Sequence, residues 1–221
     1  MHKDMILRLT KYYRILHKLK TLGLERVFAN NLGDAVGVNA AVVRKDFSLL
    51  NIMGQKRGGY EIENLITDLD KILGKDKPQR AVIVGCGRIG SALMRYSGFA
   101  VDGIHIAAGF DINPAVCEDQ HCPIPIYPMD ELERFIQEEQ IRVGIITVPE
   151  QASTEIFNRL RAVGIRGFLN FTPIELKVSR PAGTGAPIII HNVNIALELE
   201  HIFYELNITE NSEITAQLYG S

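Results

Sequence analysis

One stretch of the sequence decides the fold: Ala81-Val82-Ile83-Val84-Gly85-Cys86-Gly87-Arg88-Ile89-Gly90. It joins an apolar run, typical of a buried strand, to the glycine pattern G-x-G-x-x-G and then to an apolar helix. In such a turn the first glycine permits a tight bend, the second lets the backbone approach a pyrophosphate, and the third lets the helix pack against the strand. The free N–H groups at the start of that helix favour an anion. We therefore expect a dinucleotide to bind at Gly85, Gly87, Arg88, Ile89 and Gly90.

A carboxylate stands where the next predicted strand, 104–110, ends. At that position Asp111 would accept hydrogen bonds from the adenine ribose hydroxyls and would repel a 2′-phosphate, which favours NAD(H) over NADP(H). Its separation from the glycines is slightly more than the usual ~20 residues, and the polar segment 97–105 can absorb the excess. The alternative is that Asp111 is only a turn residue at the strand end.

Strands and helices alternate through the rest of this region. The predicted strands are 81–84, 104–110, 124–127, 143–148, 167–170 and 188–191, and the predicted helices are 89–96, 129–139, 150–163 and 194–206. Such alternation predicts an α/β fold with a doubly wound, mostly parallel Rossmann sheet, whose ligands bind at the carboxyl ends of the strands. Two segments that follow strands should therefore flank the ribose and nicotinamide, unless they are only loops stopped by proline: Thr147, Val148 and Pro149, and Asn170, Phe171, Thr172 and Pro173.

The polar segment 74–78 separates this region from an N-terminal one with a different pattern. Residues 5–22 predict an amphipathic helix, and two shorter helices over 31–36 and 39–50 meet at Gly37. Two short helices joined by a tight glycine turn are typical of a helix-turn-helix.

The two faces of the helix predicted over 39–50 differ in character. Val43, Phe47 and Leu50 would face the core, and the outer face is small, basic and polar. Small residues allow close approach to a DNA major groove, arginine pairs with guanine edges, and lysine and serine hold phosphates. The glycine-rich segment 54–60 that follows predicts a β-hairpin tip, which would be the wing of a winged helix. The predicted DNA contacts are Ala41, Arg44, Lys45, Ser48, Lys56 and Arg57.

Charge is divided unevenly along the chain. Residues 1–60 carry 11 Lys and Arg against 4 Asp and Glu, although the whole chain has a formal net charge of −2. A basic segment on an acidic body indicates a polyanionic partner for the N-terminal region, or else a random imbalance of surface charge.

Other features bear on compartment, metals and catalysis. No apolar run approaches the ~18 residues of a membrane span, and three cysteines cannot all pair, so we expect no membrane partner and a cytoplasmic protein. The segment 117–122 has two cysteines but no second ligand pair, so we expect no metal. His191 is the best candidate for a general base. It lacks partners for a catalytic set, which favours a packed histidine at a strand end.

Together, four motifs resemble the Rex family of redox-sensing transcriptional repressors over about residues 5–207. They are Val43-Arg44-Lys45-Asp46-Phe47-Ser48, Gly85-Cys86-Gly87-Arg88-Ile89-Gly90-Ser91-Ala92-Leu93, Leu169-Asn170-Phe171-Thr172-Pro173 and Ala196-Leu197-Glu198-Leu199-Glu200.

The resemblance implies three parts and two partners. A winged-helix DNA-binding domain would cover 1–78, a Rossmann NAD(H)-binding domain 79–192, and a C-terminal dimerisation helix and tail 193–221, with the helix swapped onto the partner subunit. It implies a homodimer that binds a palindromic operator in double-stranded DNA. NADH would release the operator, whereas NAD+ would be compatible with binding.

The resemblance also implies four switch residues. Arg14 matches an arginine at the domain interface, and Tyr96 matches a tyrosine of the cofactor domain. Asn194 stands where the family usually has an aspartate that exchanges between that arginine and tyrosine, and Ile195 stands where a bulky residue often approaches the nicotinamide. Asparagine can form hydrogen bonds but no ion pair, which predicts a weakened response to NADH.

Two functions remain open at this stage. The first is a repressor that senses the NADH/NAD+ ratio and is not an enzyme. The second is an NAD-dependent dehydrogenase with an accessory N-terminal helical domain. The surplus cations fall in the helix-turn-helix and the wing, which a dehydrogenase does not require, so the first function is favoured.

Overall fold

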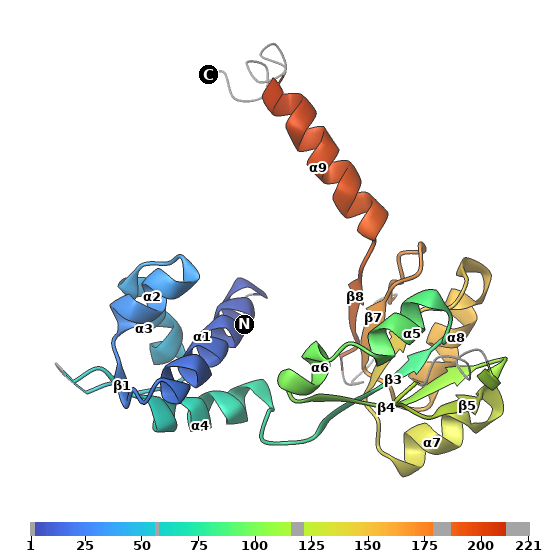
Figure 1. The fold of residues 1–221 in the computed structure, drawn as a ribbon, viewed down its shortest axis with the longest axis horizontal. Coiled ribbons are helices and arrows are strands. Elements are labelled where there is room, and N and C mark those ends of the chain that lie inside the picture. The colour runs from blue at the N-terminus through green and yellow to red at the C-terminus, as the bar shows by residue number, and fades with distance from the viewer. Residues whose placement is uncertain (1–2, 56–57, 116–121, 179–186, 211–221) are drawn as a thin grey trace. The chain divides into compact units, whose positions relative to one another are not determined.

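The computed structural model describes residues 3–55, 58–115, 122–178 and 187–210. By their contacts these residues divide into two compact units, Met1–Gln79 and Arg80–Ser221 (Figure 1). Each unit has its own hydrophobic core.

The N-terminal unit is a helix-turn-helix with a small strand pair beside it. Its elements are α1 (Lys3–Thr21), β1 (Arg26–Val27), α2 (Ala29–Val36), α3 (Ala40–Leu49), β2 (Tyr60–Glu61) and α4 (Ile62–Leu73). Strand β1 pairs antiparallel with β2. The sequence patterns described above predicted α1, α2 and α3, with α2 beginning slightly earlier than expected, but they did not predict β1.

Local signals and core packing both set the position of α3. Helix α2 ends at Gly37, whose φ of 78° is a conformation that glycine adopts at little cost. The side chain of Asn39 then caps α3 by accepting a hydrogen bond from the N–H of Val42 at 3.0 Å. Val43 and Phe47 are fully buried against α1 and α4, as their spacing predicted.

The second unit is a six-stranded sheet with helices on both faces. Its strands are β3 (Gln79–Val84), β4 (Ile104–Asp111), β5 (Ile126–Pro128), β6 (Val143–Ile146), β7 (Gly167–Asn170) and β8 (Ile189–Asn192). They lie in the order β5-β4-β3-β6-β7-β8, which is that of a Rossmann dinucleotide-binding fold. The pairings β4–β5, β3–β6, β6–β7 and β7–β8 are parallel, so the predicted fold class is confirmed.

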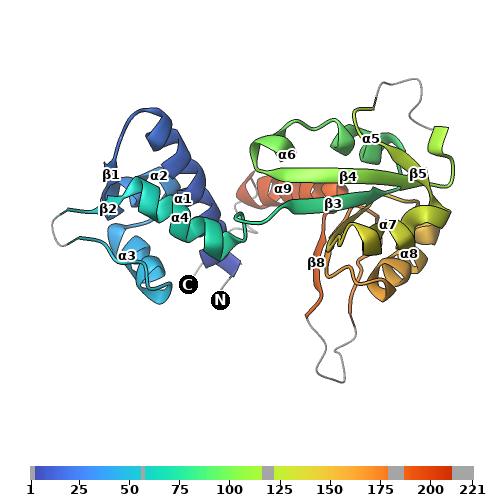
Figure 2. The same ribbon diagram turned by 90° about the horizontal axis from the view of Figure 1, so that it is seen from below.

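Helices lie on both faces of this sheet. Its helices are α5 (Arg88–Met94), α6 (Gly98–Val101), α7 (Leu132–Glu138), α8 (Glu150–Ala162) and α9 (Ile195–Glu210). Figure 2 shows α5 and α6 on one face and α7 and α8 on the other. Successive side chains of β3 follow this division, because Val82 and Val84 pack with α7 and α8, whereas Ile83 packs with Met94 of α5.

Several boundaries differ from the sequence prediction by a few residues. Helix α5 ends at Met94 instead of Tyr96, and the short α6 occupies the segment expected only to lengthen the connection to β4. Strand β6 ends at Ile146 instead of Val148, because Pro149 directly precedes α8 and the chain must leave the sheet before it.

Helix α9 follows β8 and exposes apolar side chains on two sides. Ile195, Leu199, Ile202 and Leu206 recur at helical spacing on one side, and Leu197 and Tyr204 lie on the other. Each of these side chains is at least 44% exposed in the single chain. No helix within the described ranges is long and apolar enough to cross a membrane. An apolar helix of this kind is typical of one that a partner covers.

Candidate functional site

The glycine turn lies at the point where the strand order reverses, between β3 and β6. Gly85 has a φ of 93°, and a Cβ there would lie 2.8 Å from backbone atoms of Thr147. A Cβ on Gly90 would collide with the carbonyl oxygen of Gly85, so this glycine lets α5 pack directly on the turn. Gly87 differs, because a Cβ there would meet nothing within 4 Å. The turn is therefore closed on its protein side and open at Gly87.

Asp111 at the end of β4 holds the turn in place. One carboxylate oxygen accepts a hydrogen bond from the N–H of Cys86 at 2.7 Å, and the other accepts one from the N–H of Asn113 at 2.9 Å. The hydrogen bond from Asn113 is that of a turn residue at a strand end, the alternative role considered for Asp111. The hydrogen bond from Cys86 gives Asp111 a second role, because it ties the end of β4 to the glycine turn. Each oxygen retains acceptor capacity for a ribose hydroxyl.

Small residues allow the turn and β4 to lie close together. A Cβ on Gly109 would lie 2.7 Å from Sγ of Cys86 and 2.9 Å from Sδ of Met94. Cys86 is buried, with its thiol 3.6 Å from the carbonyl oxygen of Phe110. Position 86 therefore has room only for a small side chain.

The segment after β6 reaches the glycine turn. The hydroxyl of Thr147 is 2.6 Å from the carbonyl oxygen of Gly85, a hydrogen bond that spans the reversal point of the sheet. Val148 is half-buried, and Pro149 is exposed. On the other side of the turn, Arg88 and Ile89 are also exposed.

The segment after β7 differs from the expectation. Asn170 and Thr172 are buried, and their side chains bond to each other at 2.8 Å instead of facing outward. Asn170 also donates to Asn192 of β8 at 2.8 Å and to the carbonyl oxygen of Ile174 at 2.7 Å. These side chains shape the loop from within. Half-buried Phe171 and exposed Pro173 are the members that remain accessible.

The outer face of α3 is built as predicted. The side chains of Ala41, Arg44, Lys45 and Ser48 are all exposed, on the face opposite Val43 and Phe47. Lys56 and Arg57, the predicted wing cations, lie outside the described residues. Residues on either side of them, Gln55 and Gly59, pair as an isolated antiparallel bridge.

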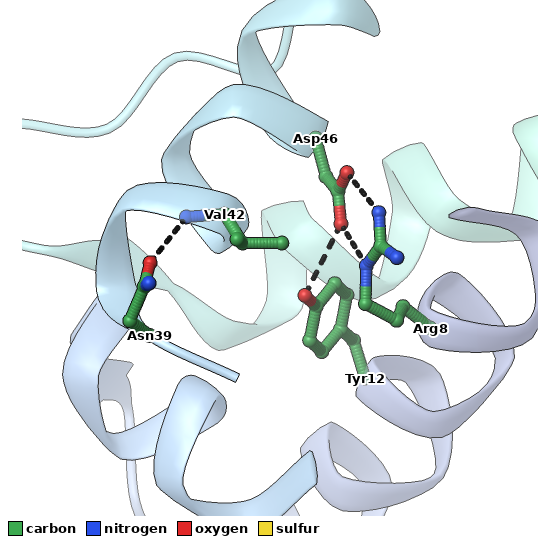
Figure 3. Close-up of polar contacts among 5 residues, drawn as sticks. All are labelled: Arg8, Tyr12, Asn39, Val42 and Asp46. Carbon is green, nitrogen blue, oxygen red and sulfur yellow. Dashed lines mark hydrogen bonds and ion pairs between the residues drawn. The ribbon is translucent and has the colours of Figure 1, made fainter. Parts of the chain in front are cut away.

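Two cations of this unit that the sequence left without a role have defined partners. Arg26 of β1 donates to the side chain of Gln55 at 2.8 Å and to the carbonyl oxygen of Gly58 at 3.0 Å, which fixes the base of the wing. Arg8 of α1 forms an ion pair with buried Asp46 of α3, and both contacts of its guanidinium group are 2.7 Å long (Figure 3). This hydrogen-bonded pairing keeps the pKa of Arg8 above its ordinary value.

Tyr12 completes this cluster and gives the N-terminal unit a pH dependence. Burial, with the nearby Asp46 carboxylate, raises the pKa of Tyr12 to about 12. Folded chains therefore keep a proton that unfolded chains lose above pH ~10. Stability from this group is complete below pH ~10 and is lost as the pH rises towards 12.

We predict that urea unfolding of the N-terminal unit, followed by circular dichroism, loses about 2 kcal/mol of stability between pH 10 and 12 through Tyr12. A Tyr12→Phe variant should lose markedly less over the same interval. Equal losses in the two proteins would contradict this assignment.

The four predicted switch residues lie on α1, just after α5, and at the start of α9. Arg14 is exposed on α1, and Tyr96 is 60% exposed, with its ring against Phe99. Asn194 caps α9 by accepting a hydrogen bond from the N–H of Leu197 at 3.1 Å. Ile195 is 59% exposed.

The structure describes two further sequence candidates. His191 is exposed on the edge strand β8, so the expectation that it is packed is wrong for the single chain. Within the described ranges, no three His, Cys, Asp or Glu side chains form a group that could hold a metal ion. Cys122 is described, whereas Cys117 lies outside these ranges.

Fold and site together define a nucleotide-binding protein with an attached helix-turn-helix unit. Two family models match the chain: a CoA binding domain over residues 76–174 and a putative DNA-binding protein N-terminus over residues 3–48. The redox-sensing transcriptional repressor Rex of Lactobacillus gasseri is 36% identical over 200 residues, which cover 90% of this chain and 91% of that protein. The chain belongs to the Rex family of redox-sensing transcriptional repressors.

Solved structures agree with this assignment. RSP, a Rex-family repressor, has been solved in complex with NAD+ and operator DNA. That structure is 30% identical in sequence, with a TM-score of 0.85 over 99% of this chain and 98% of the RSP chain. RSP in complex with NADH has a TM-score of 0.74 and 31% identity over 95% of this chain and 96% of the RSP chain.

Proposed function

We propose that this chain is a transcriptional repressor that senses the NADH/NAD+ ratio, binds a palindromic operator as a homodimer, and is released by NADH. One observation carries the proposal: a single Rex-family chain combines an open glycine turn with a helix whose outer face is basic. RSP, which shares both units, was solved with NAD+ and operator DNA and with NADH.

The cofactor would bind across the reversal point of the sheet. Its pyrophosphate would lie against Gly85, Gly87 and Gly90, with Arg88 and Ile89 at its edge. Asp111 would accept hydrogen bonds from the adenine ribose and disfavour NADP(H). The nicotinamide half would lie near Thr147, Val148 and Pro149 on one side, and near Phe171 and Pro173 on the other. Asn170 and Thr172 would act indirectly by holding their loop.

The operator would be read by two copies of α3. Ala41, Arg44, Lys45 and Ser48 would enter the major groove, and Lys56 and Arg57 would contact the backbone from the wing. Because two copies must reach half-sites about one or two helical turns apart, a modest rotation of the units would be enough to lose the operator. NADH and NAD+ must then favour different dimer geometries, since a ligand shifts a conformational equilibrium only through differential affinity.

Helix α9, within segment 193–221, would supply the dimer contact by swapping onto the partner. Its exposed apolar side chains support this assignment. A cytoplasmic regulator without catalytic activity fits the family better than a dehydrogenase does. No geometry of the described residues favours a dehydrogenase.

The proposal is tested by titrating a DNA mobility shift with NADH and with NAD+ at one fixed salt concentration, because affinity for DNA depends strongly on salt. NADH should release the DNA, and NAD+ should leave it bound. Equal retention with both cofactors would rule out redox sensing by this chain.

Arg44→Ala should weaken binding to the operator by about 1–3 kcal/mol and relax specificity at one base position, because arginine pairs with guanine edges. Lys45→Ala should weaken binding to all sequences alike and reduce the salt dependence. Fluorescence anisotropy at several salt concentrations distinguishes the two effects. Unchanged operator affinity for Arg44→Ala would remove this residue from the recognition surface.

Asn194→Asp should increase the NADH sensitivity of DNA release. Aspartate caps a helix as well as asparagine does, so α9 should be unaffected, but only aspartate can form an ion pair with Arg14. The measurement is the NADH concentration that releases half of the DNA. If this concentration is the same in both proteins, the carboxylate at this position does not carry the signal.

A further inference from the structure

We propose that Arg8 and Asp46 are positioning residues that fix the rotation of α3 about its own axis, and so aim Arg44, Lys45 and Ser48 at DNA. This inference rests on the proposed function and adds to it the device that orients the reading helix. Neither Arg8 nor Asp46 faces outward with those three residues, because the pair joins the inner side of α3 to α1 (Figure 3).

The geometry of the pair is directional. Asp46 Oδ2 accepts from Nε of Arg8, and Asp46 Oδ1 accepts from a terminal nitrogen of Arg8, both at 2.7 Å. The hydroxyl of Tyr12 donates to Oδ2 at 3.2 Å. The Asp46 side chain is 4% exposed, and Asp46 is the one charged residue among the buried positions that the structure describes.

Apolar packing decides which face of α3 lies inward, but it leaves small rotations about the helix axis weakly defined. Val43 and Phe47 hold α3 against the core, but hydrophobic burial has no preferred direction. A bidentate arginine–carboxylate contact has a fixed planar geometry, which adds directional specificity. Because Asp46 lies on the same helix as the side chains that face DNA, a rotation of α3 that moves its carboxylate also displaces them.

A partly buried ion pair of this kind is a weak source of net stability. Removing two charges from water costs about as much as their attraction returns, so an apolar cluster of the same shape is often equally stable or more so. An apolar cluster would not, however, fix the orientation of α3 about its axis.

An aromatic contact extends the same arrangement to the wing. Phe47 packs edge-on against Tyr12 with ring centroids 5.5 Å apart, and edge-on against Tyr60 of β2 at 4.9 Å. The residues around Asp46 therefore connect α1, α3 and the base of the wing. A change at Asp46 should therefore alter the orientation of α3 relative to both α1 and the base of the wing.

The test uses the full-length chain and a DNA that the chain selects for itself. Wild-type protein recovers its preferred duplex from a randomised library, and affinity for that duplex is compared with affinity for a scrambled one. Asp46→Ala alone leaves the Arg8 guanidinium and the Tyr12 hydroxyl without a partner and can fail by unfolding. The decisive variant is the triple change Arg8→Met, Tyr12→Phe and Asp46→Leu, because leucine has the branched shape of aspartate and no buried polar group remains.

We expect the triple variant to unfold within a few degrees of the wild-type midpoint, but to lose at least about tenfold of its preference for the selected duplex, comparable to one misplaced base contact. Its affinity for the scrambled duplex should change little. A triple variant that is folded and keeps the wild-type preference overturns the proposal, and so does one that unfolds well below the wild-type midpoint, since the pair is then needed for stability itself. A wild-type protein that recovers no preferred duplex would instead contradict the proposed function.

Discussion

Ile202→Asp should convert the dimer into folded monomers. Ile202 lies on the broader apolar side of α9 and is 52% exposed in the single chain. In the proposed swapped dimer this side chain would be covered, so the substitution removes its burial, worth about 1.5–3 kcal/mol, and places an unpaired charge in the interface. A symmetric dimer contains the change twice, so the free energy of association should weaken by roughly 5 kcal/mol. The dissociation constant should then rise by about three to four orders of magnitude.

Sedimentation velocity at micromolar concentration measures this effect directly. Asn207→Asp is the matched control, because it adds the same charge to α9 at an exposed polar position. The control should remain dimeric. The Ile202→Asp protein should keep its circular dichroism spectrum, because most of α9 makes little contact with the core of its own unit. A dimer that survives Ile202→Asp would show that this side of α9 is not the interface.

Gly87→Ala should weaken cofactor binding strongly without disturbing the fold. A Cβ at Gly87 meets nothing within 4 Å, and the residue has an extended backbone with a φ of −63°. In the empty protein the added methyl group would therefore occupy open space. When a pyrophosphate lies against the turn, that same space would be filled, and the NADH affinity should fall by at least about 2 kcal/mol, or roughly 30-fold.

Gly90→Ala is the contrasting variant. Its Cβ would collide with the carbonyl oxygen of Gly85, so it should lower both the thermal midpoint and NADH affinity. NADH fluorescence titrations combined with thermal melts separate the two glycines. The Gly87→Ala protein should also stay bound to DNA in the presence of NADH. If the Gly87→Ala protein binds NADH as tightly as the wild-type protein does, the pyrophosphate does not lie against Gly87.

Sequence patterns predicted the elements that depend on local periodicity. The strand–turn–helix at Gly85 was foreseeable because strand burial, glycine geometry and helix packing are all encoded within ten neighbouring residues. The outward face of α3 was foreseeable for the same reason, since Val43 and Phe47 define its inner face by spacing alone.

Features that depend on distant residues were not foreseeable in this way. Strand β1 is too short to show a period and exists through its pairing with β2. Asp46 and Arg8 are 38 positions apart, and nothing local indicates that they meet. Asn170 was expected to face a ligand, but its partner Asn192 lies 22 positions away, on a strand whose neighbour could not be known from the sequence.

The close approach at Gly109 has a consequence for how this protein can change over evolutionary time. Because a Cβ there would lie 2.7 Å from the sulfur of Cys86, the two positions cannot vary independently. A Cβ at 109 would also lie 2.9 Å from Sδ of Met94, so alanine there requires the side chains at both 86 and 94 to shrink or move. Substitutions at position 109 should therefore arise together with changes at these two positions.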